Sequence, residues 1–345
     1  MGNQPEAERA VRWYAANYPD QQLPPDEFDV FDPMLHDWAI AERFFSPVIK
    51  NATRNNMRAQ PDIARALPYV SRIASMLGLP ETQAELAAAA LTDPSLEVES
   101  RANLHEALAL GLVALGRTVE AFEHFDSAAV LINTSSALLE AAEWRVVAAA
   151  IGLPGNEEHT YDEFGPLLDS LSGDSTVGHR AAWARGLAAL TNGDDEGANG
   201  FAAILRSSPD SAAVRLGSLL HALTSAAAGR FTDALNETQG LLATDSAARG
   251  GDPFARAVLH MKRAEWLDSL GRHSAADSAR MWYEHFEMRK LFEGEAQAAE
   301  IDWALGPYAM WVRGAAAALR ENQLGACKHL TRVTELWSES DDPFL

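Results

Sequence analysis

Paired carboxylates near large aromatic side chains are the residues of this sequence best suited to chemistry. Glu265 and Asp268 stand three residues apart, so they share one face of any helix that contains them, and Asp302 precedes Trp303. Two carboxyl groups separated by about 5 to 9.5 Å can act as acid and base in glycoside hydrolysis. Five tryptophans crowd the same region, as sugar-stacking residues would: Trp266, Trp282, Trp303, Trp311 and Trp337. One alternative is therefore an enzyme on an α/α toroid, and another is a small-molecule binder in this Trp-rich C-terminal third.

A structural explanation of the same residues is favoured. Large aromatic side chains fill wide gaps between helices in a chain whose small residues are mostly alanine. The sequence contains no Walker A motif, and no GxGxxG, HExxH, GxSxG or EF-hand pattern. We therefore expect a protein that is not an enzyme, with no catalytic residue and no cofactor.

Metal ligands are equally sparse in the sequence. Asp194, Asp195 and Glu196 could hold a calcium ion, but a turn that begins a helix with acids at its positive end is favoured. His273 and His285 lie twelve residues apart, so no metal site is expected from them. Cys327 is the single cysteine, and we expect it to be a small core residue.

The charge balance limits the classes of partner. The chain has 345 residues and a formal net charge of −21, which disfavours nucleic acid and anionic membranes and attracts basic partners. A solvated acidic surface is the alternative reading. The N-terminus has no basic segment followed by an apolar one, and no apolar run approaches the length of a membrane span. These features predict a cytoplasmic protein.

Two regions can be distinguished along the chain. Residues 1–60 are expected to form an N-terminal capping region, with a Pro/Asp-rich connector at 17–33. Its acidic stretch 26–33 contains Phe28 and Phe31, which would cap the first repeat; a docking peptide is the alternative. Residues 61–345 form helices separated by short breaks, which predicts a helical repeat domain.

The breaks recur at intervals of 36 to 51 residues: Gly78, Gly116, Gly155, Gly193, Gly229, Gly271 and Asn322. Seven residues before each break stands a small residue, as at Ala109 and Gly186, and an alanine commonly follows five residues after it. Small residues at these positions would let two antiparallel helices approach closely. Glycine or asparagine at the break would supply the left-handed conformation that ends the first helix.

These units resemble divergent tetratricopeptide (TPR) repeats, most clearly over residues 106–131 with Gly116, Ala121 and Phe125. The final segment resembles the terminal repeat of large bacterial regulatory proteins, although no kinase or helix-turn-helix motif is present. The resemblance implies an all-α, right-handed superhelix (a solenoid) of about seven TPR-like hairpins. Its spacing is longer than the family's, so other helical hairpin repeats stay open.

The resemblance also implies a concave groove lined by the first helix of each hairpin. The family's contact positions fall on ten residues here: Asn103, Glu106, Leu110, Arg145, Arg180, Trp183, Leu187, Met261, Glu265 and Asp268. Such a mixed set suits an extended peptide. The expected function is that of a scaffold or sensor that binds a protein or peptide partner, preferably a basic one.

Overall fold

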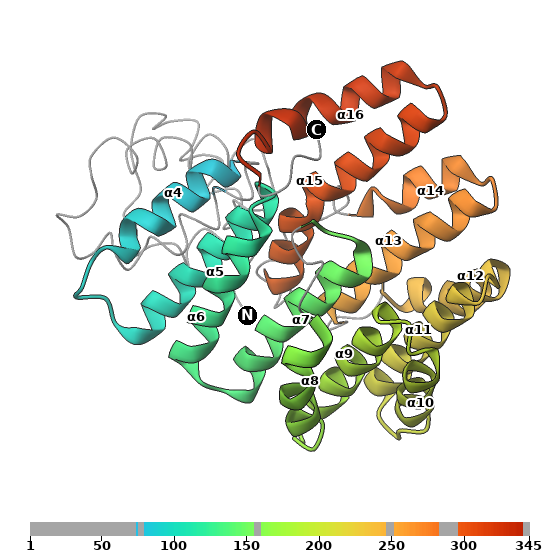
Figure 1. Cartoon of the computed structure of the whole chain (residues 1–345), viewed down its shortest axis with the longest axis horizontal. Coiled ribbons are helices and arrows are strands. Elements are labelled where there is room, and N and C mark those ends of the chain that lie inside the picture. The colour runs from blue at the N-terminus through green and yellow to red at the C-terminus, as the bar shows by residue number, and fades with distance from the viewer. Residues whose placement is uncertain (1–73, 75–78, 155–159, 246–251, 283–295, 341–345) are drawn as a thin grey trace, which may run out of the picture.

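The computed structural model describes residue 74 and residues 79–154, 160–245, 252–282 and 296–340 (Figure 1). All regular structure in these residues is helical, which confirms the all-α prediction for them. They contain thirteen helices: α4 (Pro80–Leu91), α5 (Val98–Ala114), α6 (Thr118–Ile132), α7 (Ser135–Ile151), α8 (Thr160–Leu171), α9 (Gly178–Thr191), α10 (Asp195–Arg206), α11 (Ser211–Ala227), α12 (Phe231–Asp245), α13 (Pro253–Ser269), α14 (His273–Ala279), α15 (Ala296–Leu319) and α16 (Gln323–Leu336). No helix among them is long and apolar enough to cross a membrane.

The turns between the helices repeat one hydrogen-bond pattern. Gly116 has a φ of +72°, its N–H donates to the carbonyl of Val113, and the N–H of Arg117 donates to the carbonyl of Leu112. This pair of hydrogen bonds is typical of a helix C-terminus at which the residue after the helix, here Gly116, adopts the left-handed conformation. Gly193, Gly229 and Gly271 have φ values of +77°, +77° and +72° and the same pair of bonds. The predicted role of these four glycines is confirmed.

Other predicted breaks are displaced or lie outside the described residues. Gly78 and Gly155 lie outside them, as do residues 1–60 with the predicted cap. The left-handed turn after α7 is made by Gly152, which has a φ of +78°. Because Gly152 closes α7 with the repeated hydrogen-bond pair, the break near residue 155 begins three residues earlier than expected.

The prediction for the last turn is wrong by one residue. Glu321 takes the left-handed conformation, with a φ of +59°, whereas Asn322 has a φ of −86° and caps the start of α16 by accepting the Gly325 N–H. Counting from Glu321 places Gly314 seven residues before the turn and Ala326 five residues after it. Both are buried, and a Cβ at Gly314 would lie 2.5 Å from Leu330. Cys327 is exposed, so its expected place in the core is wrong too.

The two ends of the described helical array are in contact. Helix α15 packs against α5 and α13, and α13 packs against α7. The Tyr308 hydroxyl on α15 donates to the carbonyl oxygens of Ile151 and Gly152, each at 2.8 Å. Figure 1 shows the C-terminal hairpin, in red, beside the N-terminal helices of the array, in blue and teal. The array therefore closes on itself, while its handedness and its number of hairpins stay predictions.

Aromatic side chains fill the space between the helices. Trp144 on α7 is buried, stacks on Phe125 with ring centroids 4.8 Å apart, and meets Phe254 edge-on at 5.2 Å. Trp266, Trp282 and Trp337 are also buried. Their burial confirms the favoured interpretation of the tryptophans as core residues at these three positions. The physical reason is that alanine-rich helices leave gaps that only large rings can fill.

Candidate functional site

Four of the ten predicted groove residues lie in the core. Trp183 and Leu187 on α9 are completely buried, Met261 on α13 is 1% exposed, and Leu110 on α5 is 4% exposed. Helix α9 is surrounded by α7, α8, α10 and α11, and the closure of the array covers α5 and α13 in the same way. The inner face on which a ligand was expected is therefore occupied by neighbouring helices at these positions.

The two predicted arginines are held by acidic partners within the chain. Arg145 binds both carboxylate oxygens of Asp126 at 2.6 Å and lies between the rings of Phe122 and Phe164, about 5 Å from each centroid. A guanidinium group fixed by a bidentate carboxylate and two ring faces contributes to helix packing. Nothing in these contacts points to a ligand.

Arg180 on α9 connects two other helices through two carboxylates. It binds Glu143 of α7 with two nitrogens, and its Nε lies 3.1 Å from the Asp252 carboxylate at the start of α13. Glu143 is completely buried. Burial, with the nearby negative charge of Asp252, raises the pKa of Glu143 to about 8, although Arg180 acts in the opposite direction.

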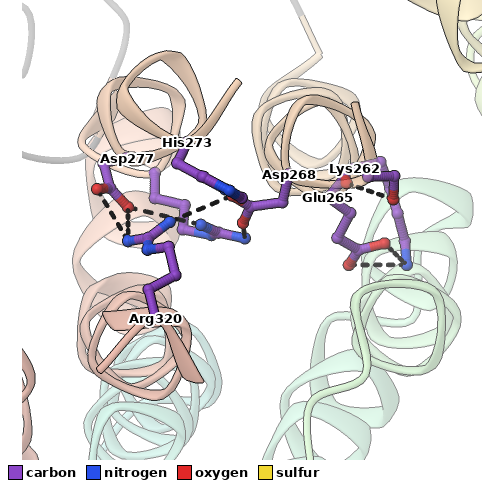
Figure 2. Close-up of polar contacts among 8 residues, drawn as sticks. Lys262, Glu265, Asp268, His273, Asp277 and Arg320 are labelled. Atoms are coloured by element: carbon purple, nitrogen blue, oxygen red, sulfur yellow. Dashed lines mark hydrogen bonds and ion pairs between the residues drawn. The ribbon is translucent and has the colours of Figure 1, made fainter. Parts of the chain in front are cut away.

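Glu265 and Asp268 are also engaged in ion pairs (Figure 2). Glu265 accepts hydrogen bonds from Lys262 at 2.9 and 3.1 Å. Asp268 meets His273 at 2.8 Å, Arg280 at 2.7 Å and Arg320 at 3.3 Å, which ties α13 to α14 and to the end of α15. Partial burial raises the pKa of Asp268, but the hydrogen bonds from His273 and Arg280 outweigh it and lower the value.

Asp302, the proposed partner of Glu265 in an acid–base pair, is buried. Its carboxylate accepts hydrogen bonds from Arg256 at 2.6 Å and from the Trp282 indole at 2.9 Å. Its side chain is 2% exposed. The pKa of Asp302 is raised, chiefly by burial. Asp302 therefore holds α15 against α13 and is not presented to a substrate.

The remaining predicted residues, Asn103 and Glu106, are half-buried on α5. They flank His105, which lines a groove of about 670 Å³ between α4, α5, α6 and the end of α16. We call this the seam groove, because it lies where the two ends of the array meet. Its apolar lining consists of Leu91, Leu108, Leu112, Leu115 and Leu336, together with Ala84 and Ala88. A volume of this size is typical of ligand sites.

Five glutamates also line the groove: Glu81, Glu85, Glu120, Glu335 and Glu339. Arg117 is the only arginine or lysine among the described residues that line the groove, and it lies 2.5 Å from Glu120. With neutral histidines the groove therefore carries four net negative charges. Clustered carboxylates above a low-dielectric surface concentrate cations.

Two histidines meet inside the seam groove. Nδ1 of His105 on α5 lies 2.9 Å from Nδ1 of His124 on α6, and their ring centroids are 5.1 Å apart. One ring donates this hydrogen bond and the other accepts it, so at most one of the two Nδ1 atoms carries a proton while the bond persists. The described residues contain no group of three or more side chains that could hold a metal ion.

The position of this pair is encoded in the hairpin, although the sequence interpretation missed it. His105 stands four residues before Ala109 and His124 three residues after Ala121, the two alanines at the predicted close-contact positions of the hairpin. Helical periodicity places residues three or four apart on one face, so both histidines continue the facing stripes of this hairpin. The glutamates from α4 and α16 could not be found in this way, because they belong to other hairpins.

The acidic segment 191–197 is a helix start, as favoured. Asp194 accepts the Gly197 N–H at 2.9 Å and caps α10, and Asp195 and Glu196 follow in its first turn. His285 lies outside the described residues. In comparisons with known proteins, no protein-family model matches the chain and no curated protein matches its sequence.

Proposed function

We propose that the chain is a non-enzymatic binding module, built from TPR-like helical hairpins, that holds a basic segment of a partner protein in the seam groove. The observation that carries this proposal is the presence of five glutamates beside an apolar lining in one groove. A peptide with alternating apolar and basic side chains matches both features. Its apolar side chains would cover the leucines, and its lysines or arginines would reach the glutamates.

The spread of the carboxylates favours a peptide over a small cation. Glu81 and Glu85 lie one turn apart on α4, Glu120 lies on α6, and Glu335 and Glu339 lie at the end of α16. A single ammonium group can form ion pairs only with carboxylates within about 4 Å of it, which leaves the other glutamates of the groove unpaired with the ligand. Several basic side chains on one segment can engage all three elements.

The engagement of the proposed catalytic carboxylates supports binding over glycoside chemistry. In a toroid enzyme both carboxylates would face the substrate, but Asp302 is bound to Arg256 and Trp282, and Glu265 is bound to Lys262. Trp266 and Trp282, two of the three tryptophans that the small-molecule alternative offers as pocket walls, are core residues, whereas the third, Trp311, is partly buried. The seam groove draws on neither set.

A direct test uses a labelled peptide of alternating lysine and leucine residues, titrated with the full chain and followed by fluorescence anisotropy. We expect saturable binding that weakens at higher salt, and no binding of the matching glutamate–leucine peptide. Glu81→Gln with Glu85→Gln should weaken binding by about two- to thirtyfold, since each of the two exposed ion pairs contributes about 0.2–1 kcal/mol.

A matched control is needed because a chain with a net charge of −21 attracts basic peptides everywhere. Asp195→Asn with Glu196→Gln also removes two negative charges, but from exposed positions on α10 that lie outside the groove. This control should bind the peptide as the wild type does. Equal weakening by the two double variants would show attraction to the whole surface and would refute the seam groove as the site.

A further inference from the structure

The histidine pair gives the seam groove a titratable element at its centre. His105 comes from α5 and His124 from α6, and both are partly buried against the groove lining. The carboxylates of the groove lining come from α4, from the first turn of α6, and from the end of α16 and the residues after it. The pair is thus the only part of the groove whose ordinary pKa lies near neutral pH, among the residues the structure describes.

Building on the proposed function, we propose that His105 and His124 form a proton-operated control of the seam groove. Proton uptake by the pair places positive charge among the glutamates, which weakens the hold on a basic partner. The groove binds at neutral pH and releases its partner under mildly acidic conditions. The chemistry is reversible protonation, and no covalent step is involved.

The geometry of the pair sets how many protons it takes. One added proton gives an imidazolium ring that can still donate Nδ1–H to the other Nδ1, so the 2.9 Å contact is compatible with a singly charged pair. A second proton would place two N–H groups face to face and would force the rings apart. The first proton therefore changes the charge of the groove, and the second also changes its shape.

The charged neighbours determine where the first proton binds. Burial lowers the pKa of His105, and His124 and Arg101 act in the same direction. Burial also lowers the pKa of His124, with Arg117 acting in the same direction. Glu120 and Glu123 oppose these effects and raise it. The glutamates of α6 therefore favour His124 as the site of the first proton.

The remaining carboxylates of the groove lining lie on α4 and at or after the end of α16. Glu81 and Glu85 lie across the groove on α4, and Glu335 and Glu339 close it from the end of α16. A basic peptide bound beside Glu120 offsets the influence by which this glutamate raises the pKa of His124. By linkage, the bound peptide must weaken proton binding to the histidine pair by the same factor as the proton weakens binding of the peptide.

The test measures affinity for the lysine–leucine peptide at pH 7.5 and pH 5.5 for the wild type and for His105→Gln with His124→Gln. Glutamine keeps a polar side chain but does not titrate in this range. We expect the wild type to lose about two- to fivefold in affinity on acidification, because burial lowers both histidine pKa values and so limits how much of the pair is protonated at pH 5.5. The double variant should lose little, since any protonation of carboxylates is common to both proteins. Circular dichroism at both pH values checks that each protein is folded.

A second readout does not need the peptide. Histidine ring signals in an NMR titration of the free chain should show both pKa values below the ordinary range, and His124→Gln should raise the pKa of His105, because the charge of His124 is one of the influences that lower it. Equal acid-induced losses of affinity in the wild type and the double variant, or ring signals of both histidines that do not change between pH 7.5 and pH 5.5, would overturn the proposed control. If the wild type does not bind the peptide at pH 7.5 or at pH 5.5, the proposed function is rejected, and the proposed control with it.

Discussion

The indole Nε1 of Trp337 donates a hydrogen bond to the carbonyl oxygen of Ala114 at 3.0 Å, across 223 positions of the chain. Ala114 is the last residue of α5, where helix carbonyls lack partners within the helix. Trp337 follows α16, is 3% exposed, and stacks on Tyr308 with centroids 6.5 Å apart. One side chain thus closes the helical array by satisfying a helix terminus and by filling the core.

Truncation of Trp337 should open this closure. We expect Trp337→Ala to lower the free energy of unfolding by about 3–5 kcal/mol, as for other buried aromatics. Trp337→Phe keeps an aromatic ring but loses the hydrogen bond, and should cost about 1 kcal/mol. Urea titrations followed by circular dichroism measure both values. Leu324→Ala serves as the control, because Leu324 is 86% exposed on the same hairpin and should change little. Equal costs for the three variants would contradict this account of the closure.

Two glycines with the same backbone conformation separate strain from close packing. Gly116 and Gly229 have φ values of +72° and +77°, so alanine at either position costs about 1–2 kcal/mol in the left-handed region. A Cβ at Gly116 would also lie 3.0 Å from Ser340 and 3.1 Å from the Trp337 ring, whereas one at Gly229 would meet nothing within 4 Å. Gly116→Ala should therefore be the more destabilising by about 1–3 kcal/mol.

The same urea titrations compare the two alanine variants. If they unfold at the same denaturant concentration, the turn at Gly116 is not packed against the end of the chain. A difference in the slope of the transition would instead show that the substitution changes how much of the chain unfolds together.

The helices and most of their turns could be predicted from the sequence, because left-handed glycines and alanine stripes act locally. The closure could not, because it depends on contacts such as Tyr308 with Gly152, which belong to hairpins far apart in the chain. That closure explains why Trp183, chosen from a family's contact positions, is completely buried. The seam groove escaped prediction for the same reason. Its histidine pair, in contrast, lies within one hairpin and follows from the helical spacing.

Burial of Glu143 should make stability depend on pH. Its pKa is raised to about 8, so the folded protein holds a proton that the unfolded chain releases near pH 4.5. The folded state then binds more protons between these values, and stability must fall as pH rises from about 5 to 8. Glu143→Gln, which mimics the protonated acid, should remove this component of the decline.

The measurement is the free energy of unfolding at several pH values for the wild type, Glu143→Gln and the control Glu196→Gln. Glu196 is exposed on α10, so its variant should follow the wild type. If Glu143 is instead ionised at all these pH values, Glu143→Gln will destabilise the protein by a similar amount throughout. Parallel curves for the wild type and Glu143→Gln would therefore contradict the raised pKa.

Glu321 is the one turn residue of the repeated pattern that is not glycine, among the turns that the structure describes. Its φ of +59° places a side chain in a conformation that glycine adopts without cost. Glu321→Gly should therefore stabilise the protein by up to about 1 kcal/mol, even though glycine increases the entropy of the unfolded chain. Glu321→Ala removes the same carboxylate but keeps the Cβ, so it should bring no such gain. A stabilising alanine variant would trace the effect to charge, whereas a gain confined to glycine would establish residue 321, not Asn322, as the position that sets the register of the last hairpin.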